Sequence, residues 1–339
     1  MHMRVNSALL FGTLLASAVL RAGGGTPSKA LLVLSKSDNT LSIVDPVSLA
    51  VIASLPSGPD PHEVVASADG KFAYISNYGG GAYNTITVID LVEQKALPAV
   101  DLGPLRGPHG LVFAGGKVWF TAEAAKAIGS YDPATKKVDW VLGTGQNRTH
   151  MIYASEDLKR IVTSNVSSAT MTIIEKRAGG PGRGGGPPPA DWDETVVAVG
   201  RGAEGFDVSP DGKEIWAANA QDGTISILDF AGKKVAQTLA ADVMGANRLK
   251  FTPDGKRVFV STLSGPDVSI FDAATRTVVK RVKVGRGAAG IQMQPDGSVA
   301  YVSCTPDDYV AIIDLKSLEV IRHIPAAFKL PDGLAWAAR

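Results

Sequence analysis

Residues 285–304 read GRGAAGIQMQPDGSVAYVSC, and the fold follows from this stretch. It contains a short apolar run, a Pro-Asp-Gly turn and a second apolar run. Proline pre-sets the backbone of such a turn, aspartate accepts hydrogen bonds from its own backbone, and glycine adopts the positive φ that closes a tight hairpin. Similar text recurs at residues 251–261, 208–219 and 66–77. The chain is therefore expected to be built from repeats.

Two markers recur along the chain and count the repeats. The first is an acidic residue that ends an apolar run, at Asp45, Asp90, Asp132, Glu175, Asp229, Asp272 and Asp314. The second is the residue that opens the run before each hairpin turn, at His62, His109, His150, Glu204, Asn247, Ala289 and Asp332. Successive markers lie about 43 residues apart, which is the period of a four-stranded propeller blade.

The two ends of the chain indicate how the ring closes. We label the strands of a blade A to D, from the central channel outward. The first strands in the chain, about 31–34 and 41–44, are B and C without an A, and the last, about 333–337, is an A without a B. Pairing the last strand with the first ones completes a seventh blade and leaves no open edge. The prediction is an all-β, seven-bladed β-propeller of four-stranded blades spanning residues 29–339.

The repeats resemble the YVTN-type β-propeller family over about Lys29 to Arg339. Segments 301–304 (YVSC), 74–77 (YISN) and 259–262 (FVST) match its name-giving strand. Blades three and four depart from the pattern, since the turn at 155–158 reads SEDL and blade four is longer. The resemblance implies an exported bacterial or archaeal protein. The relatives that it implies are lactonase-type propellers, surface-layer proteins and the propellers of quinoprotein dehydrogenases, and many family members have no assigned activity.

Composition excludes several classes of function. The 339 residues carry a formal net charge of +1, so no electrostatic argument favours binding to nucleic acid. The single cysteine, Cys304, rules out an intramolecular disulfide and a Cys-x-x-Cys-His haem attachment in this sequence. The sequence contains no Gly-x-Ser-x-Gly, Gly-x-x-x-x-Gly-Lys or His-Glu-x-x-His motif, which disfavours serine-hydrolase and nucleotide chemistry.

The first 22 residues are predicted to be a signal peptide. Residues 8–20 form an uncharged apolar run that is short for a bilayer span, and Ala16-Ser17-Ala18 offers a cleavage site. We therefore expect a periplasmic or secreted protein with no other membrane span. An uncleaved anchor or a disordered leader remains the alternative.

A second unusual segment, residues 178–190, is rich in glycine and proline and falls between strands C and D of blade four. Such a composition buries too little apolar surface to order itself. We interpret it as a loop insertion; a loop that docks a partner is the alternative.

The second marker places polar residues around one mouth of the channel, because strand A of every blade begins there. The ring reads His62, His109, His150, Glu204, Asn247, Ala289 and Asp332. Imidazoles followed by a carboxylate on consecutive blades suit Zn, Cu, Fe or Ni, so His62, His109, His150 and Glu204 are candidate metal ligands. The alternative is ordinary polar lining of a wet channel.

Arginines form another candidate site near the same mouth. Arg106, Arg201 and Arg286 share one repeat position, and Arg148 lies one residue later in its repeat. Guanidinium groups there would bind an anion by bidentate hydrogen bonds, unless each is a solvated loop residue paired with a nearby carboxylate. The loop at 77–84, with two tyrosines and a glycine run, is expected on the same face as a small lid or a simple exposed loop.

The sequence favours an exported, monomeric, non-enzymatic module that presents its channel mouth to a small anionic ligand or to another exported protein. The first alternative is a metal-dependent or lactonase-like hydrolase that uses the histidines with Glu204. The second is a redox-partner propeller that borrows its cofactor from another subunit. A divalent transition metal is the only cofactor that the residues suggest. Fold resemblance does not separate these hypotheses, because propellers serve all three.

Overall fold

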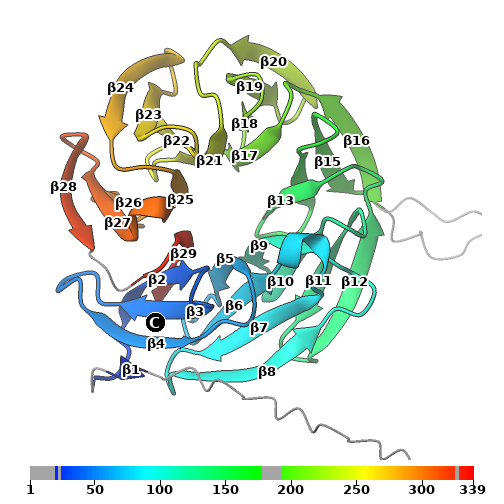
Figure 1. Cartoon of the computed structure of the whole chain (residues 1–339). Helices are drawn as coiled ribbons and strands as arrows, with labels where there is room; N and C mark the ends of the chain where they lie inside the picture. Colours follow the sequence, from blue (N-terminus) through cyan, green and yellow to red (C-terminus); the bar gives the residue numbers. More distant parts are fainter. Residues whose placement is uncertain (1–19, 22–23, 178–191, 325–327) are drawn as a thin grey trace, which may run out of the picture.

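The computed structural model describes residues 20–21, 24–177, 192–324 and 328–339. Seven antiparallel four-stranded sheets surround a central channel, with one strand of each sheet facing the axis (Figure 1). The predicted all-β, seven-bladed propeller is confirmed. The predicted signal peptide and the Gly/Pro-rich segment lie largely or wholly outside the described residues.

In blades 2 to 7 the strands follow the chain in order from the channel outward, and in blade 1 the C-terminal strand is innermost. Blade 1 contains β29 (Pro331–Ala338), β2 (Lys29–Ser35), β3 (Thr40–Val44) and β4 (Val51–Pro56), and blade 2 contains β5 (Pro61–Ala66), β6 (Phe72–Asn77), β7 (Thr85–Asp90) and β8 (Lys95–Asp101). Blade 3 contains β9 (Pro108–Ala114), β10 (Lys117–Ala122), β11 (Ala127–Asp132) and β12 (Lys137–Gly143), and blade 4 contains β13 (Thr149–Ala154), β14 (Arg160–Asn165), β15 (Thr170–Lys176) and β16 (Trp192–Ala198). Blade 5 contains β17 (Ala203–Val208), β18 (Glu214–Asn219), β19 (Thr224–Asp229) and β20 (Lys234–Leu239). Blade 6 contains β21 (Ala246–Phe251), β22 (Arg257–Thr262), β23 (Asp267–Asp272) and β24 (Thr277–Lys283), and blade 7 contains β25 (Ala288–Met293), β26 (Val299–Cys304), β27 (Tyr309–Asp314) and β28 (Glu319–Ile324).

The ring closes through strands from opposite ends of the chain. The C-terminal β29 pairs antiparallel with β2, with Leu32 opposite Ala335 and Leu31 opposite Trp336. A two-residue strand, β1 (Leu20–Arg21), adds to the outer edge of the same blade by pairing with β4. Closure pairs the inner edge of β2, which would otherwise be open to another chain.

The hairpin turns between strands A and B have the predicted chemistry. The glycines of the Asp-Gly turns adopt positive φ, for example 73° at Gly297 and 70° at Gly255. Asp254 accepts hydrogen bonds from Thr252 Oγ1 (2.7 Å) and Lys256 N (3.0 Å). The turn of blade 4 lacks the Pro-Asp-Gly sequence but keeps this geometry, because Leu158 occupies the glycine position with a φ of 51°.

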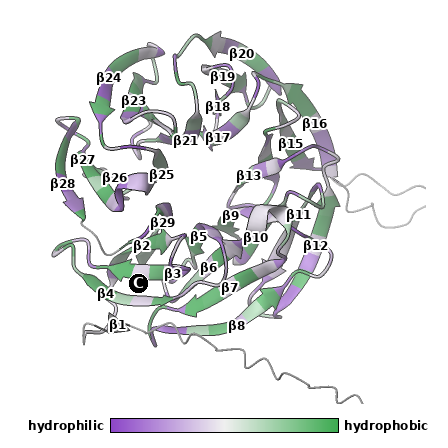
Figure 2. Ribbon diagram, in the orientation of Figure 1, coloured by the Kyte–Doolittle hydropathy of each residue, from purple (hydrophilic) through white to green (hydrophobic). Residues whose placement is uncertain are grey.

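The hydrophobic core is divided into seven layers, one between each pair of neighbouring blades. The layer between blades 6 and 7, for instance, packs Ile270 and Val268 against Ile291 and Val302. Hydrophobic residues follow the strands and hydrophilic residues concentrate at the connections (Figure 2). Because each blade is buried only against its two neighbours, the ring fixes how the inner strands lie around the channel.

Two of the connections between strands B and C, which lie on the mouth face, contain short 3₁₀ turns. These are η1 (Gly79–Gly81) in blade 2 and η3 (Thr305–Asp307) in blade 7. Within the described part of the chain, no helix has the length and apolar character needed to cross a membrane.

Candidate functional site

The predicted ring of polar residues lies at one mouth of the channel, on the second residue of every inner strand. The ring positions are His62, His109, His150, Glu204, Asn247, Ala289 and Asp332. The three imidazoles stand next to one another: the ring centroids of His62 and His109 are 4.8 Å apart, and those of His109 and His150 are 3.8 Å apart. The structure therefore brings the three histidines into one cluster.

Hydroxyl groups on the second strands of blades 2 and 3 hold this cluster in place. Thr121 Oγ1 accepts a hydrogen bond from Gly110 N (2.9 Å) and donates one to His150 O (2.8 Å), so it joins β9 to β13 of the next blade. Ser76 joins β5 to His109 O in the same way. Because the carbonyls that accept these bonds belong to the histidines, the hydroxyls fix the backbone from which the imidazoles project.

Glycine at the third position of the inner strand permits the close approach of neighbouring blades. A Cβ atom on Gly110 would lie 2.4 Å from His150 O and 2.8 Å from Met151 Cα. Both contacts are to backbone, which cannot rotate away. Gly110 is thus needed for the 3.8 Å separation of the His109 and His150 rings.

A second set of site residues comes directly after strand B, where Lys36, Tyr78 and Glu123 occupy the same repeat position. Tyr78 donates a hydrogen bond from its hydroxyl to Glu123 Oε2 (2.5 Å), and its ring contacts those of His62 and His109 at centroid distances of 4.9 and 5.1 Å. Lys36 Nζ lies 2.7 Å from His62 Nε2. Lys36 and Glu123 were not among the predicted site residues, and Tyr78 was expected only in a small lid or a simple exposed loop; their shared repeat position is the signal that identifies them.

A third set lies directly before strand A, where the backbone is left-handed in every blade. Blades 3, 5, 6 and 7 use glycine there, whereas Asp60 (φ 44°), Arg148 (φ 56°) and Leu330 (φ 51°) do not. A non-glycine residue in this conformation is strained by about 1 kcal/mol or more. Asp60 contacts His62, and Arg148 contacts Glu123 and Glu204 beside His150, so two of the strained positions supply charged groups to the site.

His150 is held between two carboxylates. Its Nδ1 lies 2.5 Å from Glu123 Oε1 and its Nε2 lies 2.9 Å from Glu204 Oε1. Burial opposes protonation, but the charge of Glu204 and the contact with Glu123 outweigh it and raise the pKa of His150 to about 9. Arg148 adds a second cation, with Nε 3.7 Å from Glu123 and Nη2 3.5 Å from Glu204.

His109 and His62 are both held neutral, mainly by burial. His109 is 3% exposed, and burial together with the neighbouring His150 holds its pKa well below the usual range. Its Nδ1 has no hydrogen-bond partner among the residues that the structure describes. Burial and the nearby Lys36 ammonium lower the pKa of His62 to about 4. Neutral imidazole is the form that coordinates metals.

One group of donor atoms is compact enough to bind a metal ion. Ligand atoms of His109, Glu123 and His150 all lie within 4.8 Å of one another, and the three side chains are buried. Glu204 lies on the far side of His150, and His62 lies beyond His109. Of the four predicted ligands, the structure places His109 and His150 in this group and adds Glu123.

The charge balance around the cluster also favours a cation. The carboxylates are Asp60, Glu123, Glu204 and Asp332, and the permanent cations are Lys36 and Arg148. With neutral imidazoles the cluster therefore has an excess of two negative charges. The proton on His150 supplies one compensating charge, and a divalent ion in its place would supply both.

The predicted arginines do not form one anion site. Arg201 pairs with Asp222 (2.7 Å) and Arg286 with Asp307 (2.6 Å), each in a neighbouring loop and largely exposed. Arg106 is exposed, and its Nε lies 3.4 Å from Ala82 O. Arg148 is the member of the set that contacts the two carboxylates on either side of His150.

The remaining ring residues lie apart from the compact donor group. Asp332 contacts Lys36 (3.4 Å) and His62 (3.7 Å), so it belongs to the edge of the cluster. Asn247 accepts a hydrogen bond from Arg248 Nη1 (3.3 Å) on its own strand. Cys304 is fully buried at the end of β26, and burial raises the pKa of its thiol to about 12, which disfavours a metal thiolate.

The acidic markers at the strand ends are structural. Asp45 Oδ1, for example, accepts hydrogen bonds from the backbone N–H groups of Val47 (2.8 Å) and Ser48 (2.9 Å). Equivalent bonds recur at Asp90, Asp132, Asp229, Asp272 and Asp314. Glu175 differs, because it pairs with Arg160 and Lys233.

Comparisons with known proteins agree with this architecture. A family model described as YNCE-like beta-propeller matches residues 187–326. The sequence finds no match among curated proteins.

Similar solved structures share the fold at low sequence identity. A functionally unknown protein from Desulfotomaculum acetoxidans superposes with a TM-score of 0.74 at 15% identity, over 91% of this chain and 99% of its own. A candidate 6-phosphogluconolactonase from Bacteroides uniformis gives 0.73 at 16% identity, over 91% and 99%. Dihydro-heme d1 dehydrogenase NirN, in complex with DHE, gives 0.64 at 16% identity, over 91% and 66%. With its closed ring of seven blades and its repeated YVTN-like strands, the chain is a YVTN-like β-propeller.

Proposed function

We propose that the channel mouth binds a divalent transition-metal ion through His109, Glu123 and His150, and that the protein is a metal-dependent hydrolase of small esters or lactones. The proposal depends on one observation: three buried ligand atoms lie within 4.8 Å of one another, and one of the imidazoles has an unpartnered nitrogen. Two imidazoles and a carboxylate leave coordination positions open for water and substrate.

The surrounding residues suit hydrolysis. A metal lowers the pKa of bound water, which supplies the nucleophile at neutral pH. Glu204 contacts Nε2 of His150 from outside the ligand group, and we propose that it would accept a proton from the attacking water and return it to the leaving alkoxide. Arg148 is 42% exposed at the edge of the site, so it is available to stabilise the oxyanion. Water adds to the carbonyl carbon, the ester C–O bond breaks, and a carboxylate and an alcohol form.

The first measurement is the metal content of protein purified without chelator and without a histidine tag. We expect near-stoichiometric zinc, iron, nickel or copper in the wild type and none in His109→Ala/His150→Ala. Asn247→Ala, at the same repeat position on the other side of the mouth, should retain the metal. A folded, metal-free wild type that also fails to bind added metal would overturn the proposal. Turnover of δ-valerolactone by the loaded protein, abolished in Glu204→Gln, would establish the reaction.

A binding or scaffold role is the second candidate, and exposed apolar residues favour it. Met244 and Leu263 lie on connections of the mouth face and are 54% and 51% exposed. A partner protein or the apolar part of a ligand would cover them. Metal-loaded protein without hydrolytic activity towards esters and lactones would support this function. The redox-partner hypothesis has only the shared fold of the dehydrogenase in its favour.

We also propose that the protein acts outside the cytoplasm, on the basis of the apolar run at residues 8–20. Mass determination of the mature protein from a periplasmic or secreted fraction tests this. Cleavage after Ala18 or near residue 22 is the expected result, and a full-length protein confined to the cytoplasm would contradict it.

A further inference from the structure

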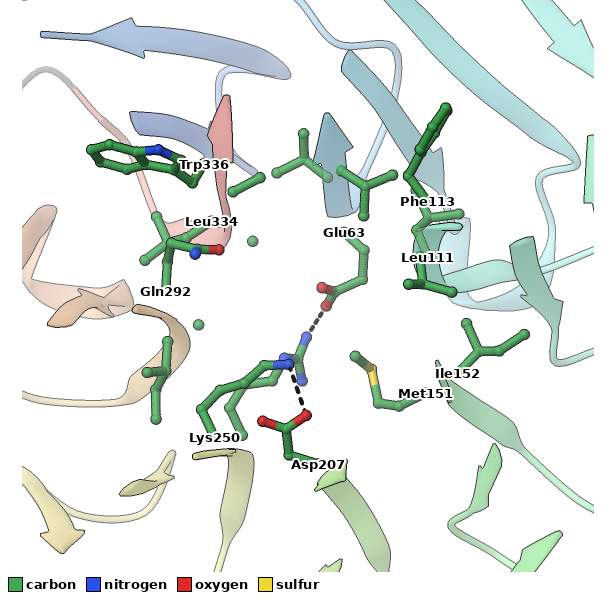
Figure 3. Close-up of a pocket in the computed structure, with 18 of the residues that line it drawn as sticks. Glu63, Leu111, Phe113, Met151, Ile152, Asp207, Lys250, Gln292, Leu334 and Trp336 are labelled. Atoms are coloured by element: carbon green, nitrogen blue, oxygen red, sulfur yellow. Dashed lines mark ion pairs between the residues drawn. The ribbon is translucent and has the colours of Figure 1, made fainter. Parts of the chain in front are cut away.

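The charged groups deeper inside the channel are paired with one another. A cavity of about 320 Å³ lies there, and its lining contains two ion pairs, Glu63 with Arg248 and Lys250 with Asp207, as Figure 3 shows. Each charged group of this lining thus has a partner. The outer rim of blade 4 differs, because it combines an unpaired carboxylate with an unpaired backbone edge.

Most outer strands of the propeller contain a β-bulge. In β24 and β28 the bulged residues are Val279 and Ile321, which have no opposite residue on the neighbouring strand. Equivalent shifts of register occur in β4, β8, β12 and β20. A bulge bends and twists an edge strand, and this hinders pairing with another chain.

The outer strand of blade 4 is regular along its whole length. The seven residues of β16 pair one by one with residues 170–176 of β15, without a shift of register. β16 lies on the outer rim (Figure 1), and no strand of the described chain pairs with its other edge. Because β16 also contains no proline, it presents the even row of backbone N–H and C=O groups with which another strand can pair.

Blade 1 shows that an outer edge of this propeller accepts an added strand. β1 pairs antiparallel with Ala53 and Ser54 of β4, and the bulge of β4 follows directly at Ile52. The two pairs of β1 therefore lie on the regular part of that edge. In β16 the regular part extends over seven residues, so it has room for a longer added strand.

The side chains of β16 indicate what an added strand must supply. Trp192, Glu194 and Val196 alternate along the strand and therefore share one face. Trp192 packs against Trp140 at a ring-centroid distance of 5.4 Å, so this face is turned towards blade 3. Val196 is 46% exposed. The Glu194 carboxylate has no hydrogen bond or ion pair with a described residue, and partial burial raises its pKa because no cation offsets the burial.

The unpaired carboxylate selects the kind of strand that fits. A basic side chain beside Glu194 and an aliphatic one beside Val196 would satisfy both residues. Since Glu194 and Val196 are two positions apart, the added strand needs the same spacing. A second copy of this chain does not meet the requirement, because its β16 carries no basic residue and would bring another Glu194 to the seam.

We propose that β16 is a docking edge, and that it binds an extended segment of a partner protein by strand addition. The segment carries a basic and an aliphatic residue two positions apart. Backbone hydrogen bonds to β16 hold the segment, and its side chains beside Glu194 and Val196 give the specificity. The proposal does not depend on metal or hydrolysis at the mouth.

Titration of the full-length protein with the capped, fluorescently labelled heptapeptide TTVTKTT tests the chemistry of the partner. Antiparallel to β16, its valine lies beside Val196 and its lysine beside Glu194. We expect TTVTETT to bind at least about fivefold more weakly, because it places two carboxylates side by side. Methylation of the backbone nitrogens of the third and fourth residues removes an N–H that points at β16 in either orientation and should abolish binding. Equal affinity of the three peptides, or no binding of TTVTKTT at about 5 mM, would overturn the proposal.

Charge reversal then locates the site. Glu194→Lys should reverse the preference, so that TTVTETT binds at least about fivefold more tightly than TTVTKTT. Glu319→Lys, on the bulged outer strand of blade 7, is the matched control and should leave the preference as in the wild type. An unchanged preference in Glu194→Lys would contradict the assignment.

Hydrogen exchange tests whether the edge is free and becomes paired. Alternate amides of β16 should exchange fast in the free protein, and saturating TTVTKTT should slow them at least about tenfold, while the amides of β24 stay unchanged. Amides of β16 that are all protected in the free protein would show that the edge is already occupied, and this would overturn the proposal.

Discussion

The two halves of the channel mouth have the same backbone and opposite chemistry. At the three repeat positions that face the mouth, most residues of blades 1 to 4 are charged or titratable, as Asp60, His62 and Lys36 are; the exceptions are Leu330, Gly107 and Val166. At the same positions, blades 6 and 7 carry glycine before strand A and, farther along, Asn247, Ala289, Leu263 and Thr305. The repeated backbone determines where side chains project into the mouth. The residues that differ between repeats determine which ligand the mouth can bind.

The difference extends to solvent exposure. His109 and His150 are 3% and 1% exposed, whereas Leu263 is 51% exposed. Charged and titratable groups are therefore buried in one half, while an apolar group is exposed in the other. Both arrangements cost free energy in an isolated protein, and a bound metal and a covering ligand or partner would each remove one of these costs.

The largest effect is expected when the carboxylate of the donor group is removed. Glu123→Gln should weaken metal binding by about a hundredfold or more, because a neutral amide is a poor ligand for a transition metal. Glu204→Gln makes the same change on the other side of His150 and should cost about tenfold. Competition titration with a chromophoric chelator measures both constants.

The matched control lies in the other half of the mouth. Leu263→Ala, at the repeat position of Glu123, should leave the metal affinity unchanged. If Glu204→Gln proved more damaging than Glu123→Gln, the ligand assignment would be wrong.

The next largest effect is expected when a methyl group is added where the inner strands of neighbouring blades approach each other most closely. Gly110→Ala and Gly290→Ala place a Cβ atom 2.4 and 2.3 Å from the carbonyl oxygens of His150 and Asp332. Each should lower the free energy of unfolding by about 2 kcal/mol, measured in urea. Metal affinity should fall only in Gly110→Ala, which lies between His109 and His150. Equal losses of metal in the two variants would show that the site responds to global strain rather than to local geometry.

The smallest effect is expected for the hydroxyls that join the blades. Thr121→Val and Ser261→Ala each remove a donor to a buried carbonyl, His150 O at 2.8 Å and Ala289 O at 2.6 Å. Each should lose about 1 kcal/mol of stability. Thr121→Val should also weaken metal binding several-fold, since it loosens the strand that carries His150, and Thr121→Ser should restore it. An unchanged metal affinity in Thr121→Val would mean that the hydroxyl only stabilises the fold.

The sequence predicted the fold almost completely because the fold is periodic. Repeat spacing located the inner strands, and the unmatched strands at the two ends predicted the pairing of β29 with β2. The same spacing placed His62, His109 and His150 at one mouth.

The composition of the site was less predictable. Glu123 reaches His150 from the preceding blade, 27 residues earlier in the chain, and no local pattern indicates this contact. The structure does not bring the predicted arginines together into one site, for a similar reason. Arg201 and Arg286 pair with Asp222 and Asp307 of neighbouring loops, which spacing alone does not reveal. Period gives the position of a residue around the ring, but contacts between blades depend on how each connection folds.

The pairing of β29 with β2 determines when the ring can close during synthesis of the chain. The inner edge of β2, with Leu31 to Leu34 fully buried in the finished ring, has no partner until residues 331–338 are synthesised. Those residues also bring Asp332 to His62. The ring therefore cannot close before β29 is made, and a product that stops before residue 331 exposes a hydrophobic edge that proteolytic surveillance can recognise. Neither the closed ring nor the complete mouth can form before the last strand is made.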